Sequence, residues 1–389
     1  MAPPGNSSTL RPELAPLIAD IQSRGLRIDR SGKTTRVGGA GPSDAGMISI
    51  EGVNITAPVG SSFVAESPYT LREDIFGQWA VFMGDERVAM AELADRPRYY
   101  DLTTDDGIPY WKIALLHLDS LASTVVQKCA YWGTDDQCKF CGIELTLESG
   151  STIAAKRPEH LAEVAVAAKE LDDVVDITLT TGSTYGPDKG ALYLGRCAQA
   201  MHAATGLPVE AQFEPPEDLD VLSQVHDMGV SAVGIHMESF DPVVLAHVAP
   251  PKARTGIEGY FRAWERAIEV FGEGQVSTYV ILGMGEDPDL TVAGCKRAID
   301  MGVYPFIVPL RPVPGSLLED LLPPDAAYME SVYRRVVPYL VDRGIGSWNV
   351  SAGCARCQAC SGMSLIEQEY IELSAPDKNR THIPIRSID

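Results

Sequence analysis

Two groups of three cysteines carry most of the chemistry that this sequence suggests. They are Cys129, Cys138 and Cys141 in the stretch CAYWGTDDQCKFC, and Cys354, Cys357 and Cys360 in the stretch CARCQAC. Thiolates that converge from a loop bind metals, either a zinc ion or the iron atoms of an iron–sulfur cluster. The sequence therefore predicts a metal centre at each group.

The first group favours an iron–sulfur cluster with one open iron. A structural zinc site needs four ligands, usually from two paired sets, whereas this loop offers three. A cubane cluster held by three cysteines leaves one iron free to bind a chelating cofactor or substrate. Phe140, directly before Cys141, is an aromatic side chain able to pack against a flat ring. A zinc loop, including a catalytic zinc with three protein ligands, is the alternative.

The second group has two residues between successive cysteines, a spacing that also suits an iron–sulfur cluster. A zinc knuckle is the main competitor, although no fourth ligand is evident nearby in the sequence. The other two cysteines, Cys197 and Cys295, lie in segments that read as helices. We expect both to be small buried hydrophobic residues.

The chain has 389 residues and a formal charge of −21, from 53 acidic and 32 basic residues. This charge argues against nucleic acid or an anionic membrane as the main partner, because both would repel the chain. No run of apolar residues is long enough for a transmembrane helix. The first residues lack a basic segment followed by an apolar one, so we expect no secretory signal and a cytoplasmic location. In that compartment thiols stay reduced.

The elements that must position the cysteines form an α/β pattern. Apolar strands alternate with amphipathic helices, which indicates a parallel sheet covered by helices. The predicted strands are 123–128, 174–181, 208–214, 231–237, 275–282 and 304–310. Six such units predict a partial (β/α)6 TIM-type barrel over residues 121–345. We expect an N-terminal β-rich domain over 1–120 and a C-terminal cysteine-rich extension over 346–389. The stretch GGAGPSDAG lacks the lysine of a phosphate loop and is interpreted as a turn-rich loop.

The first cysteine group directly follows the first predicted strand, at the mouth where barrel enzymes place their chemistry. Here the sequence resembles the radical S-adenosylmethionine (SAM) superfamily, whose motif is CxxxCxφC with φ aromatic. Phe140 and the final CxxC match, while eight residues separate Cys129 from Cys138 instead of three. The resemblance implies a [4Fe–4S] cluster whose open iron binds the amino and carboxylate groups of SAM. It also implies reductive cleavage to a 5′-deoxyadenosyl radical, with flavodoxin or ferredoxin as the electron donor.

The same resemblance gives expected cofactor contacts at the strand ends. The short motif containing Thr181, Gly182 and Ser183 is expected to contact the amino group of the bound methionine. Glu238 follows the fourth strand, where a carboxylate would bind the ribose hydroxyls. Gly283 begins the stretch GMGE, whose backbone is expected to lie along the adenine.

Four further polar residues have two interpretations each. Gln212 and Glu214 share a side of the third strand and face either the barrel mouth or solvent. His236 either contacts a substrate or is a satisfied core histidine. Arg311 either binds a carboxylate of cofactor or substrate in a bidentate manner, or pairs with an acidic neighbour.

Over nearly its whole length the chain resembles the radical SAM proteins of nitrilase-associated (Nit1-type) gene clusters, in stretches such as PYWKIALLHLDSLAS, QFEPPEDL and RPVPGS. This resemblance implies an enzyme that modifies a small, nitrogen-containing metabolite. The barrel is also similar to that of biotin synthase, so sulfur insertion from the second cluster is an alternative outcome. A non-catalytic metal-binding protein is the third hypothesis, which the open three-cysteine loop disfavours.

Overall fold

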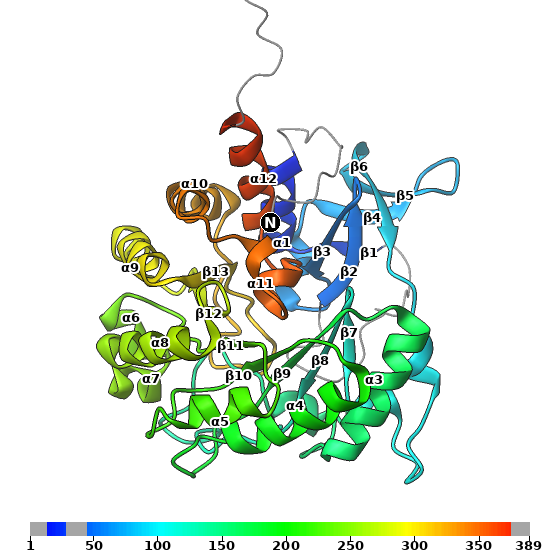
Figure 1. Cartoon of the computed structure of the whole chain (residues 1–389). Helices are drawn as coiled ribbons and strands as arrows, with labels where there is room; N and C mark the ends of the chain where they lie inside the picture. Colours follow the sequence, from blue (N-terminus) through cyan, green and yellow to red (C-terminus); the bar gives the residue numbers. More distant parts are fainter. Residues whose placement is uncertain (1–13, 29–44, 375–389) are drawn as a thin grey trace, which may run out of the picture.

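The computed structural model describes residues 14–28 and 45–374 (Figure 1). The chain forms a curled, mostly parallel sheet covered by helices and a separate N-terminal sheet. The expected turn-rich loop at 38–46 lies almost entirely outside the described residues, as does the end of the C-terminal extension.

The larger sheet has the strand order β13-β12-β11-β10-β9-β8-β7. Its strands are β7 (Leu115–His117), β8 (Ser120–Thr124), β9 (Asp176–Thr180), β10 (Val209–Gln212), β11 (Ala232–Gly234), β12 (Val276–Leu282) and β13 (Val303–Pro309). Strands β8 to β13 pair in parallel, which confirms the predicted (β/α)6 arrangement, and β7 adds an antiparallel edge strand. The first parallel strand ends at Thr124 rather than at residue 128. Beyond it, Val126 makes one isolated bridge to Ala155 as the chain leaves the sheet.

Helices flank the outer face of this sheet (Figure 1). They are α3 (Pro158–Asp172), α4 (Ala191–Thr205), α5 (Val221–Asp227), α6 (Pro242–Val248), α7 (Pro250–Thr255), α8 (Ile257–Phe271), α9 (Pro288–Met301) and α10 (Ala326–Asp342). The short helix α2 (Leu145–Glu148) follows the first cysteine loop. Cys197 in α4 and Cys295 in α9 are fully buried, as predicted. Aspartate side chains cap the amino ends of α6, α9 and α10 by accepting backbone N–H groups, which fixes where these helices begin.

The N-terminal part is β-rich, as expected, and its six strands follow the order β1-β4-β5-β6-β2-β3. The strands are β1 (Arg27–Ile28), β2 (Ala45–Ile50), β3 (Val53–Pro58), β4 (Tyr69–Glu73), β5 (Trp79–Met83) and β6 (Glu86–Leu93). Helix α1 (Leu14–Arg24) packs on this sheet and shares its core with Leu365 of the C-terminal extension. Short 3-10 turns lie at Ser62–Glu66, Arg98–Asp101, Tyr110–Lys112 and Ser347–Asn349.

The C-terminal extension contains α11 (Cys354–Cys357) and α12 (Met363–Ser374). In Figure 1, α11 lies between β3 of the N-terminal sheet and the strands of the larger sheet. The backbone N–H of Thr56 in β3 and the amide of Gln22 in α1 both donate to the carbonyl of Ala359, at 2.8 and 3.0 Å. The second cysteine group is therefore held between the two sheets. Among the described residues, no helix is long and apolar enough to cross a membrane.

Candidate functional site

The first cysteine loop lies against the carboxyl ends of the parallel strands. The N–H of Ala130 donates to the carbonyl of Ser183 at 2.7 Å, which ties the loop to the segment after β9. The N–H of Cys129 donates to a carboxylate oxygen of Glu144 at 3.1 Å, and the N–H of Lys139 donates to the carbonyl of Val248 at 2.8 Å. Backbone hydrogen bonds thus fix both ends of this loop.

Gly182 allows the chain after β9 to touch the cysteine loop. Its N–H donates to the carbonyl of Val126 at 2.8 Å. A Cβ atom at this position would overlap the carbonyl oxygen of Lys128, immediately before Cys129. Gly182 belongs to the motif expected to bind the methionine amino group. Its lack of a side chain lets this motif pack closely against the residue before Cys129.

Burial raises the pKa of all three thiols of this loop, to about 12 for Cys141. The charge of Cys129 further raises the pKa of Cys141, and the charge of Cys141 raises that of Cys138. The three thiols therefore lie within electrostatic reach of one another. Binding of a metal would remove the thiol protons and compensate the buried negative charge.

The long gap between Cys129 and Cys138 is anchored at two points. The hydroxyl of Tyr131 donates to Glu214 at 3.2 Å, and the guanidinium of Arg254 makes two hydrogen bonds to Asp136, at 2.6 and 2.8 Å. These contacts attach the extra residues to the end of β10 and to α7. The insertion thus forms part of the barrel rim.

Two predicted cofactor residues lie after β11, close to the first loop. Glu238 is buried and accepts a hydrogen bond from Nζ of Lys252 at 2.9 Å. The charge of Lys252 also lowers the pKa of Cys138, which places this pair near the thiols. Glu238 has a φ of 75°, a left-handed conformation that non-glycine residues rarely adopt. Because β11 ends at Gly234, both His236 and Glu238 lie beyond the strand and do not share a strand face.

His236 is held as a neutral ring with one unpartnered donor. Its Nδ1 accepts the backbone N–H of Tyr279 at 3.1 Å, so the ring hydrogen is on Nε2. Burial and the nearby charge of Lys252 lower the pKa of His236 well below its usual value. Nε2 is buried and has no hydrogen-bond partner. A buried N–H without a partner is a place where a bound molecule could accept a hydrogen bond.

The other predicted cofactor positions lie around the same rim. Gly283 has a φ of 101°, and a Cβ atom there would meet Pro324 at 2.7 Å. Its N–H and that of Met284 donate to the carboxylate of Glu286, so the GMGE stretch forms a tight turn. The hydroxyl of Thr181 donates to the carbonyl of the next residue at 3.0 Å.

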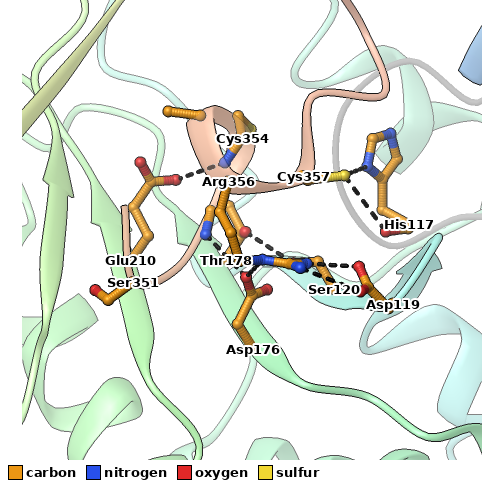
Figure 2. Close-up of polar contacts among 12 residues, drawn as sticks. His117, Asp119, Ser120, Asp176, Thr178, Glu210, Ser351, Cys354, Arg356 and Cys357 are labelled. Atoms are coloured by element: carbon orange, nitrogen blue, oxygen red, sulfur yellow. Dashed lines mark hydrogen bonds and ion pairs between the residues drawn. The ribbon is translucent and has the colours of Figure 1, made fainter. Parts of the chain in front are cut away.

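The second cysteine group lies at the opposite, amino-terminal end of the strands. Glu210 in β10 is fully buried and accepts the backbone N–H of Cys354 at 3.3 Å (Figure 2). Gly353 has a φ of 92°, and a Cβ atom there would overlap the carboxylate of Glu210. The N–H of Gly353 also donates to Asp176, the first residue of β9, at 3.2 Å. The extension thus closes the barrel at the amino-terminal end of its strands.

Arg356 attaches this loop to the barrel by two ion pairs. Its guanidinium binds both oxygens of Asp119, at 2.5 and 3.1 Å, and its Nε binds Asp176 (Figure 2). Asp176 has no exposed surface. Burial raises its pKa, while the charge of Arg356 acts in the opposite direction. Because Arg356 stands between Cys354 and Cys357 in the sequence, this ion pairing sets the position of the whole cysteine group.

Side chains from three parts of the chain meet the second group. His117 in β7 lies with Nδ1 3.5 Å from Sγ of Cys357 and with Nε2 3.6 Å from Sγ of Cys360. Thr56 in β3 has its hydroxyl 3.2 Å from Sγ of Cys360, and Arg311 donates to that hydroxyl at 2.9 Å. Although burial acts to raise it, the positive charges of His117 and Arg311 lower the pKa of Cys360 to about 6.

A cavity of about 380 Å³ connects the two cysteine groups. Phe140 and Cys141 line one end of it. The other end is lined by His117, Cys354, Cys357 and Cys360. Between them lie side chains of all the parallel strands except β11, including Thr124, Thr178, Gln212, Tyr279, Ile281 and Val308. The barrel interior is thus open to both groups.

The arrangement of the cysteines bears on which metal centre they could hold. Within residues 14–28 and 45–374, no three cysteine, histidine or acidic side chains are grouped tightly enough to hold one metal ion. The ligands of an iron–sulfur cluster bind different irons and are spaced farther apart. Three thiols in one loop at each end of the cavity are the kind of ligand set that iron–sulfur clusters use.

Two predicted cofactor residues lie beside the second cysteine group. Gln212 faces inward, but its amide donates to Glu210 at 2.6 Å and to Sγ of Cys354 at 3.4 Å. Arg311 lines the cavity and donates to the hydroxyl and carbonyl of Thr56. Both side chains therefore contact the second group, and no acidic side chain pairs with Arg311 among the described contacts. Gln212 differs from Glu214 because β10 ends at Gln212, so the alternation stops there.

Sequence reasoning missed His117 and Glu210. Each lies in an apolar strand, where a single polar residue resembles an ordinary core position. The two come together with the cysteines only because β7, β10 and the C-terminal extension meet at one end of the barrel. Their separation of more than 140 residues from Cys354 gives no local signal in the sequence.

No protein-family profile matches the chain. In sequence it is 27% identical over 132 residues to bacteriochlorophyllide c C-7(1)-hydroxylase of Chlorobaculum limnaeum, a match that covers 33% of each protein. In structure it is similar to the hydrogenase maturase HydG of Carboxydothermus hydrogenoformans, with 18% identity, a TM-score of 0.45 and coverage of 58% of this chain and 52% of HydG.

Methylornithine synthase (PylB) matches with 16% identity and a TM-score of 0.45, covering 58% of this chain and 62% of PylB. A radical SAM methyltransferase of Sphaerobacter thermophilus matches with 14% identity and a TM-score of 0.44, covering 72% and 75%. The chain thus spans a third of the curated relative and about half of HydG. Of these similar proteins, the one from Sphaerobacter thermophilus is described as a radical SAM methyltransferase.

Proposed function

We propose that the chain is a radical SAM enzyme that modifies a small metabolite inside the barrel. One observation carries this proposal: the three-cysteine loop lies at the carboxyl end of the parallel strands, and Cys141 lines the interior cavity. Cys129, Cys138 and Cys141 would hold a [4Fe–4S] cluster with an open iron for SAM. When bound and reduced, this pair supplies a 5′-deoxyadenosyl radical that abstracts hydrogen from a substrate.

The residues of the rim would orient the cofactor. Thr181, Gly182 and Ser183 lie against the cysteine loop and offer small groups and carbonyls to an ammonium. Glu238, placed by Lys252, is proposed to bind the ribose hydroxyls. Gly283 would bring the backbone of the GMGE turn close to the adenine.

The cavity would hold the substrate and keep water away from it. Its volume of about 380 Å³ suits a small metabolite, for which nitrogen-containing compounds are our first candidates. Apolar side chains such as Ile281 and Val308 form part of its wall, while Thr124 and Thr178 provide hydroxyl groups. The Nε2 hydrogen of His236 lacks a partner, but His236 does not line this cavity.

The second cysteine group is proposed to hold an auxiliary iron–sulfur cluster. Its three thiols come from one loop, and that loop is fixed by Arg356 and by the close contact of Gly353 with Glu210. This fixed geometry suits a permanent cofactor. A flavodoxin or ferredoxin is the proposed electron donor, and the cytoplasm, where thiols stay reduced, is the proposed location.

Sulfur insertion is a second candidate, and one observation favours it. Cys354, Cys357 and Cys360 line the same cavity as Cys141, so a substrate inside the barrel would reach both groups. An auxiliary cluster labelled with ³⁴S-sulfide would then transfer the label to the product and lose sulfide within one turnover. An intact cluster after product formation would exclude this outcome.

The proposal is tested by electron paramagnetic resonance of the reconstituted, reduced protein. SAM should change the spectrum of the cluster bound by the first group, because its amino and carboxylate groups replace the ligand on the open iron. The change should remain in the Cys354→Ala/Cys357→Ala variant and be absent in Cys138→Ala. A spectrum that SAM leaves unchanged would reject the proposed cofactor.

A further inference from the structure

His117 is placed among the thiols of the second cysteine group. Its two ring nitrogens lie 3.5 Å from Sγ of Cys357 and 3.6 Å from Sγ of Cys360. Figure 2 shows the imidazole beside Cys357, with the backbone of His117 also within reach of that thiol. The residue ends β7, the antiparallel edge strand, so it approaches the cysteines from a different element than the one that carries them.

We propose that His117 is the fourth protein ligand of the auxiliary iron–sulfur cluster held by Cys354, Cys357 and Cys360. The inference rests on the auxiliary cluster of the proposed function and adds to it a ligand from outside the cysteine loop. A neutral imidazole nitrogen is a known ligand of iron in protein clusters. Three cysteines and one histidine would give every iron of a [4Fe–4S] cluster a protein ligand.

Three other side chains around the second group are poorer ligands. Arg311 is permanently protonated and has no lone pair to offer. The amide nitrogen of Gln212 already donates to Glu210 and to Cys354, and the hydroxyl of Thr56 accepts a hydrogen bond from Arg311. Among the described residues that line the cavity, His117 carries the single imidazole.

The surrounding charge gives a physical reason for a neutral fourth ligand. Glu210 is fully buried and touches the backbone of Cys354, and Asp176 is fully buried beside Gly353. A fourth thiolate would add one more negative charge to this region, where burial already penalises carboxylates. An imidazole completes the cluster without adding charge. Histidine ligation also raises the reduction potential of a cluster relative to cysteine ligation.

With His117 as a ligand, the two ends of the cavity would hold differently ligated clusters. The cluster of the first group would keep one iron open for SAM, whereas the auxiliary cluster would have all its irons ligated by protein. Such a cluster suits electron transfer or the electrostatic positioning of a substrate better than direct binding of the substrate to iron. His117 would therefore make the auxiliary cluster unable to bind a substrate at an open iron, unlike the cluster of the first group.

The test uses the full-length Cys129→Ala/Cys138→Ala/Cys141→Ala variant, in which only the second group can bind a cluster. Pulsed electron paramagnetic resonance of the reduced protein should show a strongly coupled ¹⁴N nucleus. Growth with ¹⁵N-histidine should replace this signal by the ¹⁵N pattern. His117→Ala in the same background should abolish the coupling, and added imidazole should restore it. His226→Ala, which changes an exposed histidine on α5, is the matched control and should keep it.

Three results would overturn the inference. The first is an auxiliary cluster with full iron content and no coupled nitrogen, and the second is a coupling that persists in His117→Ala. The third is the absence of iron, or zinc in its place, at the second group. In that third case the proposed SAM chemistry still stands if SAM changes the spectrum of the first cluster, so the two failures are distinguishable. His117→Cys, which keeps a ligand, covers a failure of the alanine variant to fold and should give a cluster without nitrogen coupling and with a lower reduction potential.

Discussion

Cys141 and Cys354 line one cavity from opposite ends of the barrel. Cys141 belongs to the loop at the carboxyl ends of the strands, and Cys354 to the extension that closes their amino-terminal ends. A molecule in the cavity would lie between the two metal centres that the sequence predicts. The two cysteine groups, which are far apart in the sequence, therefore belong to one candidate site.

Removing cysteines of the second group should leave the cluster of the first group in place. The Cys354→Ala/Cys357→Ala variant should bind about half the iron of the wild-type chain, because one of two clusters is lost. It should still cleave SAM, since the first loop is anchored to other elements. Iron analysis and chromatography of 5′-deoxyadenosine measure both. Unchanged iron content would contradict the auxiliary cluster.

Gly182→Ala should disturb the first loop. The added methyl group would overlap the carbonyl of Lys128, so the loop or the segment after β9 must move. We expect a loss of about 2 kcal/mol in the free energy of unfolding, as for other overpacked positions, and weaker binding of iron at the first group. Gly84→Ala is the control for iron binding: its φ of 62° also strains an alanine, but a Cβ atom there meets nothing within 4 Å. Equal iron content in the two variants would argue against the close contact.

Because Lys156 is buried, the free energy of unfolding should depend on pH. It is fully buried and donates to Gln127, and burial lowers its pKa from 10.5 to about 7. The unfolded chain therefore binds more protons between about pH 7 and 10.5, so wild-type stability should rise with pH across that window. Lys156→Met should be more stable than wild type by about 3 kcal/mol near pH 6, given about 1.4 kcal/mol per pKa unit less the lost hydrogen bond. This advantage should shrink above pH 7.

Urea denaturation at several pH values measures this effect. The control is Lys169→Met, which changes an exposed lysine on α3 and should leave the pH dependence as in wild type. A constant difference between Lys156→Met and wild type from pH 6 to 10 would show that Lys156 keeps an ordinary pKa.

The effects of the Glu238–Lys252 pair on protein stability and on SAM binding should be separable. Lys252→Met leaves Glu238 buried without its partner and should cost about 3 kcal/mol. Replacing both residues, as Lys252→Met/Glu238→Leu, should recover much of that stability because no unpaired charge remains. SAM binding, measured by equilibrium dialysis, should stay weak in the double variant. Wild-type affinity there would exclude Glu238 as the ribose ligand.

The sequence predicts the barrel well because its signal is local. Apolar strands such as Val303–Pro309 and buried helix positions such as Cys295 follow from hydrophobic patterning alone. The first cysteine loop also has a local motif. Its anchors, such as Arg254 to Asp136, depend on where α7 lies and have no sequence signature.

The second site shows the limit of sequence reasoning. Its cysteines are adjacent in sequence, but His117, Thr56 and Glu210 reach them from three distant strands. Gln212 ends the third strand and Arg311 follows the sixth, and the sequence leaves two interpretations for each; the structure directs both side chains toward this group. Only the folding of the extension onto the amino-terminal end of the barrel brings these residues together.

The most direct test of the central claim is the formation of 5′-deoxyadenosine. The chain is reconstituted anaerobically with iron and sulfide, reduced, and given SAM. Wild type and Cys295→Ala, which removes a buried cysteine of α9, should both form 5′-deoxyadenosine, whereas Cys138→Ala should form none. Zinc rather than iron at Cys129, Cys138 and Cys141, with no 5′-deoxyadenosine from the wild-type chain, would contradict the account.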